Sequence, residues 1–125
     1  MKQELILSSL GHTWILDLDG TIVKHNGYKL DGQDTFLDGA KEFLESIPDG
    51  DMIILLTSRK LEYKELTENF LQENGVRYNY IIYEAPYGER VLINDKKPSG
   101  LNMAHALSIE RDGELYVTID INEEL

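Results

Sequence analysis

The 125-residue sequence predicts an α/β fold, a three-layer sandwich around a central, mostly parallel sheet. Short apolar runs of strand length alternate with stretches of helical period along the chain, which is typical of such folds. One run, residues 52–56, is apolar at every position, as expected for a parallel strand covered on both faces. No repeat, linker or low-complexity tract interrupts the pattern, so residues 1–125 are expected to form a single domain.

In the first half of the chain, turn and cap residues indicate where the predicted strands and helices begin and end. Asn26-Gly27 supplies the positive φ values of a tight hairpin turn, and Asp38 is a candidate cap for the helix that follows it. The expected elements are a short helical turn at 4–10, a strand at 13–16, a β-hairpin at 22–30, a helix at 38–47 and a strand at 52–56.

In the second half, Gly75 marks the end of a long helix, and apolar runs alternate with polar turns after it. The expected elements are a helix at 60–74, a strand at 78–83, a loop at 84–89, strands at 90–93 and 115–121, and a helix at 101–109 between these two strands. Together with the first half, they predict a Rossmann-like sheet with a β-hairpin beside its first strand.

The net charge, the apolar runs and the cysteine content of the sequence limit the expected partners and location of the protein. The net charge is −11, so the field of the protein repels polyanions and nucleic acid is not an expected partner. No apolar run approaches the roughly 18 residues that span a membrane, and the acidic start does not resemble a signal peptide. The absence of cysteine agrees with a reducing cytoplasm, which is the expected location.

An acidic pair follows the first buried strand directly. Asp17 and Asp19 are two residues apart, so on an extended chain their side chains point the same way. Carboxylates that lie close together repel each other unless a cation separates them or one of them takes up a proton. Either outcome indicates chemistry rather than packing.

Two other apolar runs end in polar residues that should reach the same edge of the sheet. Thr57 follows residues 52–56, and Asp95 follows residues 90–93. Magnesium favours oxygen ligands and is typically held by one or two carboxylates together with a substrate phosphate. Asp17 and Asp95 are therefore candidate Mg²⁺ ligands, while an Asp that attacks phosphorus and a second acid that moves a proton would complete a phosphatase.

The three motifs in this order resemble those of the haloacid dehalogenase superfamily of phosphatases. The segment 17–21, Asp-Leu-Asp-Gly-Thr, is similar to the first motif of that family; residues 53–59 are similar to its second and residues 91–95 to its fourth. The resemblance implies a Mg²⁺-dependent phosphomonoesterase with the following roles: Asp17 as nucleophile, Asp19 as acid and base, Thr57 as phosphate ligand, and Asp17, Asp19 and Asp95 around the metal. It also implies that the hairpin at 22–30 is a flap beside the site.

Two positions depart from the family pattern. The fourth motif usually has two acids, and here Asn94 takes the place of the first. The lysine of the third motif is missing, because no Lys occurs between Lys64 and Lys96. Arg59, Arg90, Lys96 and Lys97 are the candidate substitutes. Lys97 is favoured, since it would share a side with Asp95 in an extended segment, whereas Arg90 would begin its strand far from the site.

Spacing limits the substrate and leaves alternatives open. There is no room between the motifs for the cap domain of larger family members. The short connection at 83–90 and the segment 95–98, Asp-Lys-Lys-Pro, resemble those of small phosphatases of capsule and surface-polysaccharide synthesis. The resemblance implies a small phosphate ester, such as a sugar phosphate, as substrate, and the hairpin would offer a route to a homo-oligomer. The alternatives are a degenerate relative that binds phosphorylated ligands without hydrolysis, and a phosphoacceptor domain similar to response-regulator receivers. An EF-hand is excluded, because position twelve of the loop is Tyr28 rather than Glu.

Overall fold

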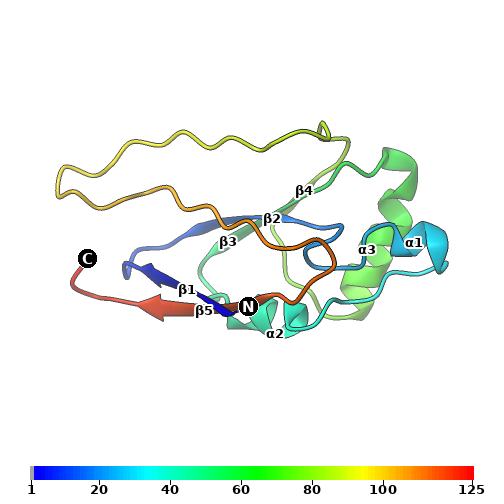
Figure 1. Cartoon of the computed structure of the whole chain (residues 1–125), viewed down its shortest axis with the longest axis horizontal. Coiled ribbons are helices and arrows are strands. Elements are labelled where there is room, and N and C mark those ends of the chain that lie inside the picture. Colours follow the sequence, from blue (N-terminus) through cyan, green and yellow to red (C-terminus); the bar gives the residue numbers. More distant parts are fainter. Residues whose placement is uncertain (1) are drawn as a thin grey trace.

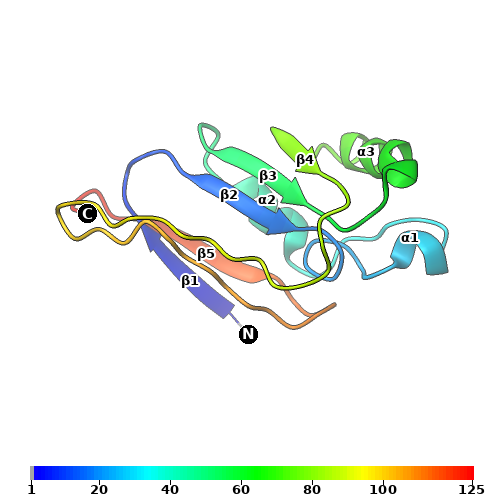
Figure 2. The ribbon, with the colours of Figure 1, turned by 90° about the horizontal axis from the view of Figure 1, so that it is seen from above.

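Two parallel sheets form the framework of this small α/β protein, and neither closes into a barrel. The computed structural model describes residues 2–125. The larger sheet has the order β2-β3-β4, formed by Thr13–Asp17, Met52–Leu56 and Tyr80–Ile82. The smaller sheet pairs β1, Lys2–Leu7, with β5, Tyr116–Ile121 (Figures 1 and 2). The arrangement is compatible with a Rossmann-like core.

Three α-helices accompany the sheets. They are α1, Gly27–Leu30; α2, Ala40–Ser46; and α3, Lys64–Glu73, which continues from the 3₁₀ turn η1, Leu61–Tyr63. Within the described part of the chain, none of the helices combines the length and the apolar character that crossing a lipid bilayer requires.

One apolar cluster joins both sheets to α2 and α3. In it, the ring of Trp14 on β2 meets the ring of Phe43 on α2 edge to face, with 5.7 Å between the centroids. The buried members of the cluster are Leu5, Trp14, Leu18, Ile22, Val23, Ala40, Phe43, Leu44, Ile47, Ile53, Leu55, Leu71 and Leu115. Burial of these side chains supplies the main driving force for folding, and it fixes the carboxyl end of β2 in place.

Most of the expected elements are confirmed. β2 and β3 form at the predicted runs, β4 and β5 form within the predicted strands at 78–83 and 115–121, and α2 and α3 form within the predicted helices at 38–47 and 60–74. Gly75 has a φ of 66° and follows the last turn of α3, as predicted for a helix stop. The predicted cap of α2 is wrong: Gly39, not Asp38, occupies the cap position, with a φ of 81°. A side chain at position 39 would collide with the carbonyl oxygen of Leu115.

Two predictions in the first 30 residues are wrong. Residues 4–10 do not form a helical turn, because Lys2–Leu7 is a strand whose backbone pairs with β5 along its whole length. Residues 22–30 do not form a hairpin. Asn26 does take the predicted positive φ, 58°, but the chain then turns into α1, which buries Tyr28 against the ring of Tyr63. Burial of that aromatic ring outweighs strand pairing, and the expected hairpin route to an oligomer is absent with the hairpin.

Two predictions in the second half are also wrong, because residues 83–115 contain neither a helix nor a strand. A strand at 90–93 parallel to its neighbours would need a crossover of a dozen or more residues, and only residues 83–89 follow β4. The chain instead runs out as an extended loop toward the end of the molecule where the C-terminus lies, and then returns (Figures 1 and 2). A nine-residue helix at 101–109 would be marginal without a surface to pack on, and Met103 and Leu107 remain exposed.

A polar cluster closes the opposite, amino end of β2 and β3. The carboxylate of Asp51 is buried and accepts hydrogen bonds from the indole Nε1 of Trp14 at 2.9 Å and from the backbone N–H of His12 at 3.1 Å. The Nδ1 atom of the His12 ring lies 2.8 Å from the same carboxylate, and its Nε2 atom lies 2.9 Å from the carbonyl oxygen of Ser8. This cluster fastens the connection between β1 and β2 to the start of β3.

Asp51 should therefore make the free energy of unfolding decrease at acidic pH. Burial opposes its charge, but the hydrogen bonds from Trp14 and His12 outweigh burial and hold the pKa below the ordinary value of 3.8. A carboxyl group whose pKa is lower in the folded state stabilises the fold fully at pH values above its unfolded pKa. This contribution is lost as the pH falls from the unfolded pKa through the lower folded pKa. We expect urea midpoints measured from pH 6 to pH 2.5 to fall more steeply for the wild type than for Asp51→Asn. The exposed Asp49→Asn is the control, and a curve for Asp51→Asn parallel to the wild type would contradict the expectation.

Candidate active site

The turn after β2 presents the acidic pair at the carboxyl end of that strand. The carbonyl oxygen of Leu18 accepts hydrogen bonds from the N–H groups of Ile22 and Val23 at 3.0 and 3.1 Å, which closes a tight loop. Gly20 has a φ of 86° within this loop, a left-handed conformation that favours glycine. Leu18 points into the core with 1% exposure, so the two aspartates that flank it remain at the rim of the sheet.

Asp17 is the accessible member of the pair. Its side chain is 38% exposed, its Oδ2 atom accepts a hydrogen bond from the hydroxyl of Thr21 at 2.9 Å, and its Oδ1 atom lies 3.1 Å from Nη1 of Arg90. The ion pair with Arg90 is itself solvent-exposed, so it contributes little to stability. The carboxylate is therefore oriented by Thr21 and open to a ligand from solvent.

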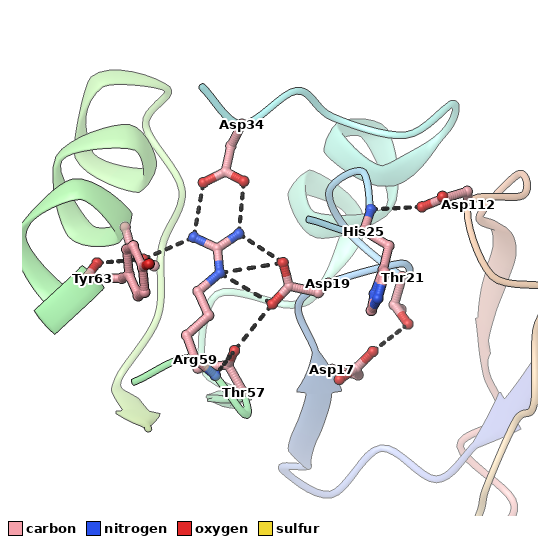
Figure 3. Close-up of polar contacts among 10 residues, drawn as sticks. Asp17, Asp19, Thr21, His25, Asp34, Thr57, Arg59, Tyr63 and Asp112 are labelled. Carbon is pink, nitrogen blue, oxygen red and sulfur yellow. Dashed lines mark hydrogen bonds and ion pairs between the residues drawn. The ribbon is translucent and has the colours of Figure 1, made fainter. Parts of the chain in front are cut away.

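Asp19 faces the opposite way, toward the strand-end residues of β3 (Figure 3). Nη2 and Nε of Arg59 lie 2.8 and 3.1 Å from the two carboxylate oxygens of Asp19, and the hydroxyl of Thr57 donates to Oδ2 at 3.2 Å. Thr57 is buried, and its N–H donates to the carbonyl oxygen of Ile82 on β4 at 2.9 Å. As predicted, Thr57 lies beside the acidic pair, where its hydroxyl contacts Asp19. The prediction that the side chains of Asp17 and Asp19 point the same way is wrong: β2 ends at Asp17, so the extended geometry does not continue to Asp19, and the two carboxylates turn to different partners.

Arg59 is the centre of the buried polar network. Besides Asp19, its guanidinium forms a two-pronged ion pair with Asp34, at 2.7 and 2.9 Å, and donates to the hydroxyl of Thr67 at 2.8 Å. All five N–H donors of the guanidinium are thus used. The group also lies 3.9 Å above the ring of Tyr28, a cation–π contact. Figure 3 shows the guanidinium between Asp34, from the loop before α2, and Asp19, from the turn after β2.

This environment settles the charge of Arg59. The side chain is almost fully buried, and burial opposes the charged form, but the hydrogen bonds to Asp34 and Asp19 outweigh burial and raise its pKa further. Asp17, Asp19 and Asp34 carry three negative charges, against two positive charges on Arg59 and Arg90. The site therefore keeps one net negative charge, which favours the entry of a further cation.

Asp95 and Lys97 do not join this group. Both lie on the exposed loop, where Nδ2 of Asn94 donates to the carbonyl oxygen of Asp95 at 3.1 Å, and the N–H of Lys97 donates to the carbonyl oxygen of Leu101 at 3.1 Å. Beyond Arg90 the loop leads back along the molecule, away from the carboxyl end of β2 (Figure 2). The expectation that Arg90 lies far from the site is wrong, because the predicted strand that would have carried it away does not form.

The donor chemistry of Asp17 fits Mg²⁺ in one respect. A partly exposed carboxylate is a hard oxygen ligand, and Mg²⁺ typically keeps several waters beside one or two carboxylates and a phosphate. The oxygens of Asp19 are already occupied by Arg59 and Thr57. Among residues 2–125, no three acidic or histidine side chains are grouped around one point. The residues thus fit a Mg²⁺ ion that would be bound by Asp17 and by water molecules, rather than by three carboxylates.

Several site residues were missed or undervalued by the sequence analysis. Arg59 follows Thr57 by two residues, and an arginine next to a predicted strand end was a usable signal. Asp34, Thr67 and Tyr28 carried no such signal, because each reaches Arg59 from a different element and only the tertiary fold brings them together.

Comparison with known proteins adds no assignment: no family model, no curated protein and no solved structure matches this chain. What the fold and site define is a class, a small α/β protein with parallel sheets and an acidic, arginine-containing cluster at a strand end.

Proposed function

We propose that the protein is a phosphomonoesterase of the small, capless haloacid dehalogenase type, with Asp17 as the nucleophile. The observation that supports this most is that the two aspartates of the acidic pair have different environments. Asp17 is open to solvent at the end of a parallel strand, while Asp19, two residues later, is held by Arg59 and Thr57. An accessible nucleophile beside a fixed acid and base is what two-step phosphoryl transfer needs.

In the first half-reaction, a carboxylate oxygen of Asp17 attacks the phosphorus atom of the ester. The bond from phosphorus to the ester oxygen breaks, and that oxygen takes a proton and leaves as an alcohol. Asp19 supplies this proton in its protonated form, after it has taken up a proton from solvent and turned from Arg59 toward Asp17. The products are the free alcohol and an aspartyl-phosphate at Asp17. Thr21, which donates to the other oxygen of Asp17 at 2.9 Å, orients the attacking group.

In the second half-reaction, water attacks the phosphorus of the aspartyl-phosphate. The ionised Asp19 accepts the proton that the water loses, and inorganic phosphate leaves with Asp17 restored. Arg59 pairs with the ionised carboxylate of Asp19, which is the form required in this step. Because all donors of Arg59 are already used, we assign it to positioning Asp19 rather than to binding the substrate.

Cations must offset the charge of the incoming phosphate. In place of Lys97, the cation adjacent to Asp17 is Arg90, whose guanidinium can move from the carboxylate to a phosphate oxygen because the pair is exposed. A Mg²⁺ ion held by Asp17 would supply further positive charge to the phosphoryl oxygens. Thr57 would donate its hydroxyl to the phosphate only after releasing Asp19.

The expected substrate is a small phosphate ester, such as a sugar phosphate, taken from the cytoplasm. Only short helices stand between β2 and β3 and between β3 and β4, so within the described residues no cap covers the site. Asp17 is accordingly reached from solvent. The net charge of −11 disfavours nucleic acid as a substrate.

The test is phosphate release from p-nitrophenyl phosphate and a panel of sugar phosphates, with and without Mg²⁺. We expect multiple turnovers that require Mg²⁺. Borohydride reduction during turnover should convert phosphorylated Asp17 to homoserine, which peptide mass spectrometry detects. A stable phosphoprotein after treatment with acetyl phosphate, without turnover, would instead support the receiver-like alternative.

A second candidate is a relative that binds phosphorylated ligands without hydrolysing them. It is favoured by the fact that guanidinium groups of the protein itself already pair with both aspartates. Saturable binding of a sugar phosphate, measured by calorimetry, together with no phosphate release across the panel, would decide for this candidate.

A further inference from the structure

A second arginine lies beside the loop that carries the acidic pair. The turn before β5 docks on that loop: the N–H of Asp112 donates to the carbonyl oxygen of Gly20 at 2.9 Å, and its carboxylate accepts from the N–H of His25 at 2.7 Å (Figure 3). This contact places Arg111 against the loop. A Cβ atom built on Gly20 would lie 3.0 Å from Cγ of Arg111. The stem of this arginine is thus fixed next to the site, although it is about ninety residues away in sequence.

The guanidinium of Arg111 is exposed and uncommitted. Three of the four arginines have partners: Arg59 pairs with Asp19 and Asp34, Arg77 donates to two backbone carbonyls, and Arg90 pairs with Asp17. Within residues 2–125, no hydrogen bond or ion pair engages Arg111. A free cation held at the rim of a negatively charged site is a ready anion ligand, because a planar guanidinium matches carboxylate and phosphate oxygens.

The two available arginines lie at different points of the loop. Arg90 contacts Asp17 itself, so it meets the phosphoryl group that Asp17 would attack, whereas Arg111 packs on Gly20, three residues further along. On the basis of the proposed function, we propose that the substrate carries a second acidic group, a carboxylate or a second phosphate, and that Arg111 binds it. The substrate class is then phosphate monoesters that bear another anion.

Substrate pairs that differ by one anionic group test this proposal. The pairs are 6-phosphogluconate against glucose 6-phosphate, and fructose 1,6-bisphosphate against fructose 6-phosphate. We expect the wild type to prefer the doubly anionic member of at least one pair in kcat/KM. Arg111→Ala should reduce that ratio by about two- to tenfold, because an exposed guanidinium contributes less than a buried one. Arg111→Lys should restore part of it.

Lys41→Ala is the matched control, because it removes one exposed positive charge from α2, away from the acidic pair. It should leave the ratio unchanged. A ratio that is unchanged in Arg111→Ala would overturn the proposal, and so would a ratio that falls equally in Lys41→Ala, since that would indicate the general field of the protein rather than a site.

A binding experiment separates this proposal from the proposed function. In the Asp17→Asn background, which blocks turnover, calorimetry compares 6-phosphogluconate with glucose 6-phosphate. Tighter binding of the doubly anionic ligand that is lost in Asp17→Asn/Arg111→Ala supports the anion site, even if the wild type shows no phosphatase activity. Equal affinities for the two ligands would refute the anion site, whatever the activity of the wild type.

Discussion

Asp17→Asn is expected to lower phosphate release by about a thousandfold or more, because an amide is a poor nucleophile toward phosphorus and cannot form the acyl phosphate. The change is nearly isosteric, and the amide oxygen can still accept the hydrogen bond from Thr21. Only the exposed ion pair with Arg90 is lost, which is worth about 0–1 kcal/mol. Steady-state phosphate release and urea unfolding measure the two effects.

The matched control is Asp31→Asn, which also breaks one exposed ion pair, that with Lys24 at 2.8 Å, away from the acidic pair. It should retain activity with a similar small change in stability. Turnover that survives in Asp17→Asn would rule out Asp17 as the nucleophile. Lost activity accompanied by a large loss of stability would show that Asp17 acts through the fold instead.

Arg59→Met is expected to cost about 3–5 kcal/mol of the free energy of unfolding, because it leaves the carboxylates of Asp19 and Asp34 without their cation. The side chain of Asp34 is 1% exposed, so water cannot replace the guanidinium. A loss of this size is a large fraction of the roughly 5–15 kcal/mol that holds a domain together. Urea denaturation with linear extrapolation measures it.

Two further variants identify the cause of this loss. Arg77→Met removes an exposed arginine that donates only to the backbone carbonyls of Asp51 and Pro48, and it should cost about 2 kcal/mol or less. Asp34→Leu combined with Arg59→Met should recover part of the loss, because replacing both partners of a buried pair by apolar groups is far less harmful than removing one. A loss below about 1 kcal/mol in Arg59→Met would mean that the network contributes little to stability.

The sequence was most informative where local pattern and burial agree. The continuous apolar run of β3 and the polar tips after β2 and β3 placed Asp17, Asp19 and Thr57 correctly at one edge. The role of Arg59 could not be derived in the same way, because its partner Asp34 lies in the loop between α1 and α2, which only the tertiary fold brings to Arg59. The wrong prediction of a strand at 90–93 conflicts with a simple spacing rule, because the six residues 84–89 between the two predicted parallel strands are too few for a crossover.

The pairing of β1 with β5 delays part of the folding during synthesis. Lys2 is matched with Tyr116, so more than a hundred residues must be translated before the first strand can find its neighbour. At about 5–20 residues per second, an emerging chain waits roughly 5–20 s with that edge bare. The larger sheet, whose strands all precede residue 83, can assemble on the ribosome in the meantime. Closure of the small sheet is then a late event, governed by the entropy of joining distant ends.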